Sequence, residues 1–570
     1  MPTTIEVNKQ SVEALLGSGK SKPFVIPEYQ RPYAWTDEQV ETLFEDLWDF
    51  TATSGGTERE SSYFLGSVVS YENEDGEQEI IDGQQRITSL FLLLRAIYTK
   101  LVATPASERT AEANNFIGKI EPTIWRTNKL TGTVDFKNIL LTSRVVNNEG
   151  NEILRSILET GKADEDAKDN YSKNYRHFQE LFDKHSTENP LMVYQFIYAL
   201  LNQAILLPIT ADTQDTALTI FSTLNDRGLP LSDADIFKAK IYNQLAPDDK
   251  KAFIDRWKDL DEQSTDANES IQQLFYYNMF YYRALDKDTK TTTPGVRKYY
   301  AVNKFERLYK PELLDTLFVI LNLWKVVNKG EELEDEAWSK NIKIRQTLDI
   351  LTSYPNEYWK YPVVIYYVCY RNEENFETRF ARFLNKLLME LMTKYLMIPT
   401  INAVKPDILK LNSAIVASDI PTFEFKTVDM TQLEPYIQNP NRNVVRMLLK
   451  TLAYEHQDDL LPAKWEIEHI FPQKWQTNYF PDEPDATIKE KIEHIGNKLP
   501  FEKKLNIVAG NGYFGKKKKE YIASKIVITK AMGTSDVMDW NLESITKRDI
   551  RVSDEVVKIM NRWNNEYLNT

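Results

Sequence analysis

Residues 465–473 constrain the C-terminal part of the chain more than any other segment. They read Trp-Glu-Ile-Glu-His-Ile-Phe-Pro-Gln, in which Ile-Phe-Pro turns a strand sharply into a loop. His469 directly follows the carboxylate of Glu468, and two asparagines lie downstream, at Asn497 and Asn506. Such a histidine can take a proton from an attacking water, and a divalent cation held by oxygen ligands can neutralise the leaving oxygen. The segment therefore predicts a metal-dependent phosphodiesterase site with His469 as its general base.

A second interpretation of this histidine is structural. The chain has only five histidines, and a lone histidine between isoleucines is usually a half-buried side chain satisfied by the backbone. The downstream Gly496-Asn497, Asn506 and lysine-rich sequence favour the catalytic interpretation of His469. His494 is the competing histidine, but it lacks the Ile-Phe-Pro context, so we interpret it as orienting or structural.

The charge distribution points in the same direction. A net charge of −14 argues against a protein that coats DNA in general, but phosphate binding depends on local charge. Residues 498–519 contain seven lysines and one glutamate, a local excess of six positive charges. Lysine runs are more often solvated faces, but an aromatic turn at residues 511–515 interrupts this one. That turn favours a surface that grips a nucleic-acid backbone.

Length and composition indicate a multidomain protein of the cytoplasm. A chain of 570 residues is too long for one hydrophobic core and predicts about three or four domains. Its single cysteine, Cys369, excludes a disulfide framework and a cysteine-based zinc site. The first residues lack the pattern of a signal peptide, and the longest apolar run, residues 363–370, is too short to span a membrane. We therefore expect a cytoplasmic protein with no membrane partner.

A second informative region lies near the N-terminus. Residues 24–35 read as a strand followed by an aromatic, proline-braced loop, and Thr36 with Gln39 form a capping box for the next helix. Residues 63–71 and 78–81 read as the two strands of a β-hairpin.

The return strand of that hairpin leads into a candidate anion site. A strongly apolar helix starts near Ile87, directly after Asp82-Gly83-Gln84-Gln85-Arg86. A strand, a short glycine loop and a helix N-terminus together present free backbone N–H groups to an anion, and Arg86 adds a planar fork for phosphate. Asp82 could hold a metal ion or polarise water, or it could simply cap the helix and pair with Arg86.

A third segment, residues 221–238, is a loop rich in turn residues, followed by a helix with Ser232 as its N-cap. Its functional groups are denser than a connector needs: Asn225, Arg227, Asp235 and Lys238. A well-capped, solvated loop is the alternative.

Taken together, these segments resemble the GmrSD-like restriction enzymes at both ends of the chain. The matching N-terminal residues are Ile26-Pro27-x-Tyr29-Gln30-Arg31, Phe64-Leu65-Gly66, Ile81 to Arg86, and Leu224-Asn225-x-Arg227-Gly228 with Asp235 and Lys238. The matching C-terminal residues are Glu468 to Gln473, Gly496-Asn497, Asn506, and Phe514 to Lys517 with Tyr521. The family usually continues after Gly-Asn with Leu-Thr-Leu, whereas this chain has Lys498-Leu499-Pro500.

The resemblance implies an α+β multidomain fold that is mainly helical. Residues 1–245 would form a ParB/sulfiredoxin-like domain that binds nucleotide and senses DNA, with a helical insertion at about 105–170. A helical linker domain would occupy 246–440. Residues 441–570 would form an HNH-type, or ββα-metal, nuclease domain.

The resemblance also assigns roles to the motif residues. Nucleotide binding falls on Gln30, Arg31, Asp82, Gly83, Gln84, Gln85, Arg86, Asn225, Arg227, Asp235 and Lys238. In the nuclease domain, Glu468 and Asn506 would hold Mg²⁺ or Mn²⁺. His469 would act as base, Asn497 would orient the site, and Lys517 would bind the scissile phosphate.

The implied function is Type IV restriction: cleavage of modified double-stranded DNA from phage, regulated by a nucleoside triphosphate that the enzyme hydrolyses. Two alternatives stay open, a nucleotide-switched module that binds DNA without cutting it, and an RNA-directed nuclease or toxin. The sequence also leaves open which modification and which nucleotide are recognised, and whether a homodimer cuts both strands.

Overall fold

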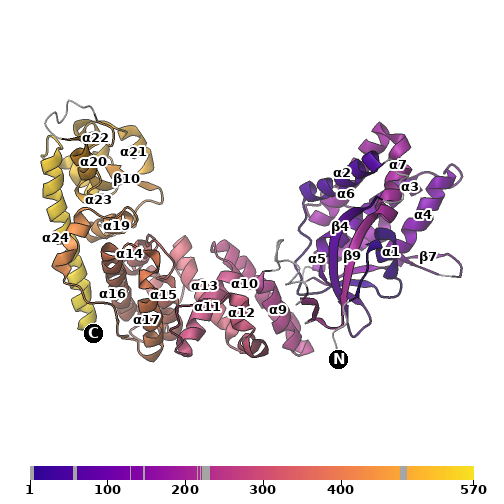
Figure 1. Ribbon diagram of the computed structural model, residues 1–570, viewed down its shortest axis with the longest axis horizontal. Helices are drawn as coiled ribbons and strands as arrows, with labels where there is room; N and C mark the ends of the chain where they lie inside the picture. The colour runs from indigo at the N-terminus through magenta and orange to yellow at the C-terminus, as the bar shows by residue number, and fades with distance from the viewer. Residues whose placement is uncertain are drawn as a thin grey trace. The chain divides into compact units, whose positions relative to one another are not determined.

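A computed structural model describes residues 6–54, 61–128, 130–145, 148–214, 216–218, 220, 232–475 and 484–569. The chain divides into two compact units, residues 1–258 and 259–570, and each is described by itself. Most residues are helical, and the larger sheet lies in the first unit (Figure 1). This confirms the predicted α+β, mainly helical fold. No helix within the described ranges combines the length and the apolar character needed to cross a membrane.

A mixed sheet forms the centre of the first unit. Its described strands are β1 (Glu6–Val7), β2 (Gln10–Ser11), β3 (Phe24–Ile26), β4 (Tyr63–Glu72), β5 (Gln78–Asp82), β8 (Leu141–Ser143) and β9 (Ala204–Ala211). They run in the order β1-β9-β4-β5-β3-β8, with β2 also paired to β9. Strands β4 and β5 are antiparallel, which confirms the predicted hairpin. Because β5 lies inside the sheet, its carboxyl end delivers the Asp82–Arg86 sequence to one defined edge.

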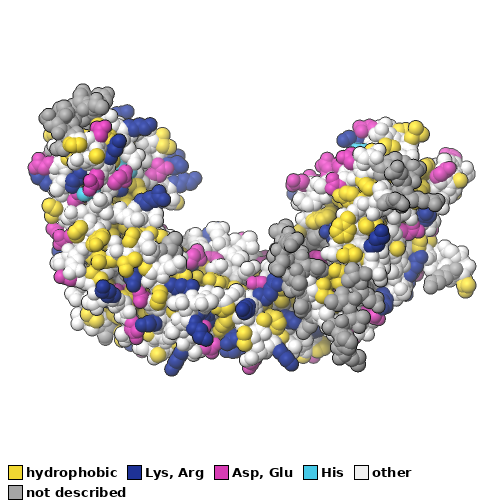
Figure 2. Space-filling model, in the orientation of Figure 1, with side chains coloured by type: hydrophobic (Ala, Val, Ile, Leu, Met, Phe, Trp, Pro, Cys, Tyr) yellow, Lys and Arg dark blue, Asp and Glu magenta, His cyan; other side chains and the backbone are white. Residues whose placement is uncertain are grey.

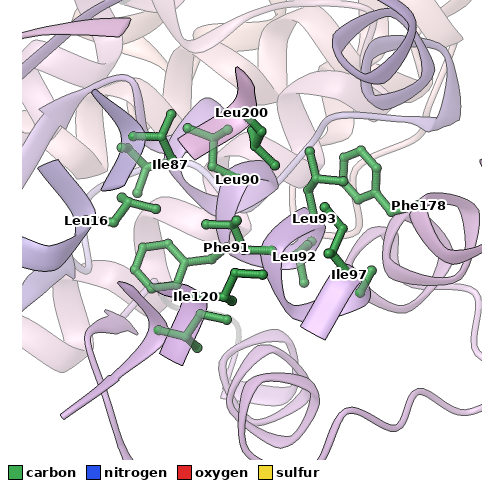
Figure 3. Close-up of a cluster of buried hydrophobic side chains, with 14 of the residues drawn as sticks. Leu16, Ile87, Leu90, Phe91, Leu92, Leu93, Ile97, Ile120, Phe178 and Leu200 are labelled. Atoms are coloured by element: carbon green, nitrogen blue, oxygen red, sulfur yellow. The ribbon is translucent and has the colours of Figure 1, made fainter. Parts of the chain in front are cut away.

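Helices of this unit pack around α3 (Gln84–Ala103), in which every residue from Ile87 to Tyr98 is buried. The other helices of the unit are α1 (Val12–Ser18), α2 (Asp37–Ser54), α4 (Ala111–Ile124), α5 (Asn148–Thr160), α6 (Asn170–Glu188), α7 (Val193–Tyr198) and α9 (Asp233–Gln244), and α10 (Pro247–Asp266) spans the boundary between the two units. Figure 3 shows side chains of α3 meeting Leu16, Ile120, Phe178 and Leu200 from several directions. Because α3 is buried on all sides from Ile87 to Tyr98, it belongs to the core, and the core fixes the position of its start.

The predicted helical insertion at 105–170 is not helical throughout. It contains α4 and α5, but also the hairpin of β6 (Trp125–Thr127) and β7 (Val134–Ile139), and β8 joins the main sheet beside β3. Asn128 and Gly132, with φ +68° at the glycine, form the hairpin turn. Strand β7 is short and its side chains are exposed or half-buried, so it does not stand out as a core strand in the sequence.

The second unit begins with the helical segment that the sequence predicts. Its longer helices are α11 (Ile271–Leu285), α13 (Leu313–Lys329), α14 (Ile342–Leu351), α15 (Lys360–Tyr370), α16 (Phe376–Met397) and α17 (Lys405–Ala417). Buried aromatic side chains such as Tyr277, Tyr366 and Tyr367 fill the space between them. The sequence predicts two domains here, 246–440 and 441–570; residues 259–440 of the first and all of the second fall within this one unit.

The C-terminal part of this unit is built on a small hairpin. Strand β10 (Trp465–His469) pairs antiparallel with β11 (Lys498–Glu502), and α21 (Lys503–Ala509) follows at once. The surrounding helices are α19 (Val445–His456), α20 (Asp485–Ile492), α22 (Phe514–Ile522), α23 (Val527–Thr534) and α24 (Leu542–Leu568). Two strands followed by a helix give the predicted ββα order. An apolar cluster that includes Ile470, Phe501 and Phe514 holds this hairpin against its helices.

Candidate active site and nucleotide-binding site

His469 ends strand β10, opposite Lys498 of β11. Its side chain is only 16% exposed, and its Nε2 lies 3.6 Å from Glu493 Oε1 and 3.5 Å from Gln473 Nε2. Burial disfavours the charged imidazolium and lowers the pKa of His469, although Glu493 acts in the opposite direction. The ring is therefore neutral at neutral pH and can accept a proton, as a general base must.

Glu468, the adjacent residue, points into the interior. Its Oε1 accepts a hydrogen bond from the Tyr521 hydroxyl at 2.7 Å and forms an ion pair with Lys517 Nζ, also at 2.7 Å. Lys517 Nζ in addition donates to the backbone carbonyl of His469 at 2.5 Å. Both charged side chains are buried, with Glu468 4% and Lys517 1% exposed. A metal ligand or a phosphate-binding cation must be accessible to the substrate, and these two buried side chains are not. Instead, they hold the end of strand β10, which carries His469.

Asn497 is fully buried and fixes the loop after His469. Its amide nitrogen donates to the carbonyls of Phe471 and Ile492, both at 3.0 Å. Its amide oxygen accepts from Phe471 N at 2.7 Å and from Trp540 Nε1 at 3.2 Å. With both donors and the acceptor used, the side chain has no capacity left for a substrate. Asn497 is a positioning residue.

His494 supports the same turn from behind. Its Nδ1 lies 2.7 Å from Asp549 Oδ2, and the other oxygen of Asp549 accepts from Gly496 N at 2.7 Å. A Cβ at Gly496 would come within 2.3 Å of the Ile545 carbonyl of α24. Only glycine therefore permits this approach, and the geometry gives His494 a structural role.

Asn506 lies half-buried on α21 and contacts a carboxylate that the sequence interpretation did not select. Its Nδ2 donates to Glu466 Oε2 at 3.1 Å, and Lys503 Nζ lies 3.6 Å from Glu466 Oε1. Among the residues that the structure describes, no hydrogen bond or ion pair joins Asn506 to His469. Glu466 and Glu468 are two residues apart on one face of β10, and the sequence alone does not show which of them reaches the surface.

Only some of the lysines that the sequence places in the basic segment 498–519 are exposed in the structure. Lys498 and Lys517 are buried and paired with Glu493 and Glu468. The exposed members are Lys503, Lys504, Lys516 and Lys519. Figure 2 shows dark-blue side chains gathered beside yellow ones in the region where α21 and α22 lie. This cationic surface adjoins Asn506, which lies on the same helix as Lys503 and Lys504.

The predicted anion site lies at the start of α3. Gly83 is the N-cap residue with φ +88°, and a Cβ there would approach Val68 Cγ2 to 3.1 Å and the Ser67 carbonyl to 3.2 Å. The first backbone bond of the helix runs from Ile87 N to Gly83 O, so the preceding N–H groups have no partner within the helix. Arg86 is half-buried, and its Nη1 donates to the Ser67 carbonyl at 3.0 Å.

Asp82 precedes this helix start. Burial raises its pKa, while the Gly83 N–H and the Arg86 guanidinium act in the opposite direction. Burial also lowers the pKa of Arg86, against the attraction of Asp82. The two groups compensate each other's charge, which agrees with the interpretation of Asp82 as a partner of Arg86.

Gln30 and Gln85 act as struts for the 27–36 loop. Gln30 is buried and donates to the Ile81 carbonyl at 3.1 Å. Gln85 Oε1 accepts from Ala34 N at 2.7 Å and from Trp35 N at 3.2 Å, and its Nε2 donates to the Pro32 carbonyl at 3.2 Å. Gln84 is half-buried beside them. These glutamines place the loop against the start of α3.

The remaining predicted nucleotide-binding residues lie on α9 and in the loop before it. Arg31 forms a 2.9 Å ion pair with Asp235, whose carboxylate also closes the predicted capping box with Ser232. Lys238 is half-buried on the same helix. Asn225 and Arg227 lie outside the described residues. Arg31 therefore connects the 27–36 loop to the N-terminus of α9.

Comparison with protein families agrees with both sites. The model of the GmrSD restriction endonuclease N-terminal domain matches residues 12–242, and that of the GmrSD C-terminal domain matches residues 429–552. The chain belongs to the GmrSD restriction endonuclease family. No curated protein matches the sequence.

As a GmrSD restriction endonuclease, the protein has DNA as its substrate. The first matched range contains the start of α3 and all of α9 except its last two residues. The second contains the β10–β11 hairpin and α21. The two ends of the chain therefore supply the two halves of one restriction endonuclease.

Proposed function

We propose that this GmrSD protein is a nucleotide-regulated, metal-dependent HNH endonuclease that cleaves modified foreign DNA in the cytoplasm. The observation that carries the proposal is His469: a half-buried, neutral imidazole at the end of β10, whose backbone carbonyl is held by Lys517. His469 takes the proton from the attacking water. Lys503, Lys504 and their neighbours hold the DNA backbone.

The residues at the surface fit a divalent cation of the magnesium type. Within the described ranges, no group of three or more His, Cys, Asp or Glu side chains is placed to hold a metal. Mg²⁺ needs fewer, because it keeps several waters and takes substrate phosphate oxygens as ligands. Glu466 offers a carboxylate, and Asn506, whose Nδ2 donates to Glu466 Oε2 at 3.1 Å, would offer its amide oxygen after a rotation of the side chain. When bound, the cation supplies charge neutralisation at the leaving oxygen.

The nucleotide half of the proposal depends on the start of α3. Unpaired N–H groups at the N-terminus of a long helix attract phosphate, and Arg86 adds a cation beside them. The loop that Gln85 and Gln30 hold in place covers the same end of the helix. Hydrolysis of the bound nucleoside triphosphate is part of the proposal, as is the sensing of the DNA modification by this unit.

The nuclease assignment is tested with His469→Ala on supercoiled phage DNA carrying different base or backbone modifications, with Mg²⁺ and each nucleoside triphosphate in turn. We expect cleavage to fall by at least about 100-fold, since that is what a general base contributes, while nucleotide turnover continues. The matched control is His177→Ala, a half-buried histidine of α6 in the first unit. Undiminished cleavage by the His469 variant would remove the assignment.

The metal assignment is tested by comparing Glu466→Gln with Glu468→Gln. If Glu466 holds the cation, its variant needs more Mg²⁺ for half-maximal cleavage, and its thermal stability stays unchanged. Glu468→Gln should instead lose stability, because it leaves Lys517 buried without its anion. If the Glu468 variant were fully stable but needed more Mg²⁺, Glu468 rather than Glu466 would be the metal ligand.

One observation favours a second candidate, a nucleotide-switched module that grips DNA without cutting it. The carboxylate adjacent to the histidine is used up by Lys517 and Tyr521. In that case the wild-type chain binds modified duplex DNA in a nucleotide-dependent way, and neither strand is nicked in Mg²⁺ or Mn²⁺. Matched single-stranded RNA in the same assay separates both candidates from an RNA-directed nuclease.

A further inference from the structure

A cavity of about 640 Å³ lies in the C-terminal unit between α19, α23 and α24. Its size is within the range of small-molecule sites, roughly 300–1,000 Å³. The apolar part of its wall includes Leu452, Met532 and Val552, and the ring of Trp540 adds a flat aromatic face. None of these residues belongs to the motifs of either candidate site.

The polar part of the wall is cationic. Arg551 stands exposed at the cavity and forms no hydrogen bond or ion pair with the residues that the structure describes. Lys547 lines the cavity one helical turn earlier and forms an exposed ion pair with Glu543 at 2.7 Å. The carboxylate of Glu555 also lines the cavity, but it lies 2.6 Å from His456 Nε2. Its negative charge is thus partly engaged. An aromatic face, apolar walls and an uncompensated arginine suit a planar ring that carries an anionic group.

Two wall residues connect the cavity directly to the catalytic hairpin. The Trp540 indole N–H donates to Asn497 Oδ1 at 3.2 Å, and the Asn497 carbonyl accepts from Ile470 N at 2.8 Å. Ile470 is the residue after His469. Trp540 also lines a small hollow beside Ile470, Phe471 and Pro472, so the same residue borders both the cavity and the loop after His469.

Arg548 makes the second connection. Its Nη1 donates to the backbone carbonyls of Ile495, Gly496 and Lys498, at 3.2, 2.8 and 2.8 Å. Lys498 is the residue paired with His469 across the hairpin. Because the guanidinium is buried yet lines the cavity, a ligand there would contact a group that already fixes the backbone of β11.

We propose that this cavity binds a nucleotide, with its base against Trp540 and its phosphate at Arg551 and Lys547, and that binding stiffens the loop and strand that hold His469. The nucleotide is either free in solution or extruded from the DNA strand, because both present the same base and phosphate. The effect of binding on cleavage rests on the proposed nuclease function, whereas the binding itself is independent of that function.

The binding test uses the full chain with His469→Ala, so that DNA stays intact. Ala531 is exposed and lines the cavity, and Ala531→Trp fills its mouth. The probes are free deoxynucleoside monophosphates and a duplex oligonucleotide with one unpaired base, each titrated by calorimetry. The matched control is Lys530→Trp, which adds the same side chain on the same helix outside the cavity. Arg86→Ala is added throughout to remove the N-terminal phosphate site.

We expect Ala531→Trp to weaken one of the two probes by at least about tenfold, or 1.4 kcal/mol, and Lys530→Trp to leave both unchanged. Loss of the free monophosphate alone identifies a soluble ligand, and loss of the unpaired-base preference alone identifies an extruded base. If both probes bind the two variants equally, or neither probe binds the parent protein, the proposal is wrong, whatever the wild-type chain cleaves.

The coupling is read by hydrogen exchange. Saturating probe should slow exchange of the Ile470 and Asn497 amides in the parent, and not in Ala531→Trp. Arg551→Gln should weaken binding without changing exchange in the absence of probe, since Arg551 has no hydrogen-bond or ion-pair partner among the described residues. Binding with unaltered exchange at both amides would overturn the coupling and keep the site.

Discussion

The two candidate sites use their motif residues in opposite ways. At the start of α3, the side chains of Gln30 and Gln85 are used up by the fold, and the ligand-binding capacity stays with backbone N–H groups and Arg86. At the end of β10, the reactive side chain of His469 stays available, while its neighbours Glu468 and Lys517 turn inward. The candidate site at α3 would therefore bind through ordered backbone N–H groups, whereas the candidate site at β10 would act through the imidazole of His469.

This difference shows what a short motif records. A motif residue marks a position where substitution is costly, but the cost arises either from contact with a ligand or from holding the group that makes the contact. Glu468 and Gln85 belong to the second class, and both lie next to a residue of the first. Substitutions can test this comparison if they separate residues that position a reactive group from residues that contact the ligand.

The largest expected effect is at the C-terminal pair. Lys517→Met leaves the Glu468 carboxylate buried without a cation and should destabilise the hairpin by about 3–5 kcal/mol. The measurement is hydrogen exchange of the β10 and β11 amides in the full chain. Lys516→Met, at an exposed position one residue earlier, should stay within about 0.5 kcal/mol.

The double variant Glu468→Gln with Lys517→Met removes both charges and should recover part of that loss. If Lys517→Met left hairpin exchange at the wild-type level and abolished cleavage, Lys517 would be a reacting group. The two sites would then resemble each other more closely than the structure indicates.

The next effect in size is at the N-terminal strut. Gln85→Ala removes the acceptor of Ala34 N and Trp35 N, and should cost about 1–3 kcal/mol for the unsatisfied groups. The loop over residues 27–36 should then exchange faster and be cut sooner by protease. Gln84→Ala, one residue earlier, should leave the loop as protected as in the wild type. Equal protection in both variants would contradict the assignment of Gln85 as a strut.

A smaller effect tests the backbone of the anion site itself. Gly83→Ala forces a Cβ into a left-handed residue beside Val68 and the Ser67 carbonyl, which should cost about 1–2 kcal/mol. Nucleotide affinity should fall with it, because the helix start moves. Gly118→Ala provides the contrast: this glycine lies in the middle of α4 with nothing within 4 Å, and alanine there should stabilise by about 0.5–1 kcal/mol. Thermal unfolding and a nucleotide titration measure the two.

Local sequence patterns were sufficient wherever short-range contacts decide the structure. The β4–β5 hairpin, the apolar helix after Arg86 and the Ser232–Asp235 capping box all follow from residues close together in sequence, and all are confirmed. The β6–β7 hairpin was missed, because β6 has only three residues and the side chains of β7 are largely exposed, so neither strand stands out as part of a core.

The site partners that the sequence did not indicate are long-range. Asn506 meets Glu466 across forty residues, and Trp540 meets Asn497 across forty-three. Whether Glu466 or Glu468 faces the surface depends on how α22 packs, since Lys517 and Tyr521 of that helix draw Glu468 inward. No spacing within residues 465–473 contains that information.

The smallest effect concerns the acid limit of cleavage. His469 works as a base only when neutral, so the rate is kept above its pKa and lost as pH falls through it. Burial lowers this pKa, and Glu493 opposes the shift by favouring the charged ring. Glu493→Gln removes that opposition, so the acid limb of kcat/KM should move to lower pH. Glu490→Gln, an exposed position on α20, should leave the limb in place. An upward or absent shift in the Glu493 variant would mean that the titrating base is not the imidazole at the end of β10.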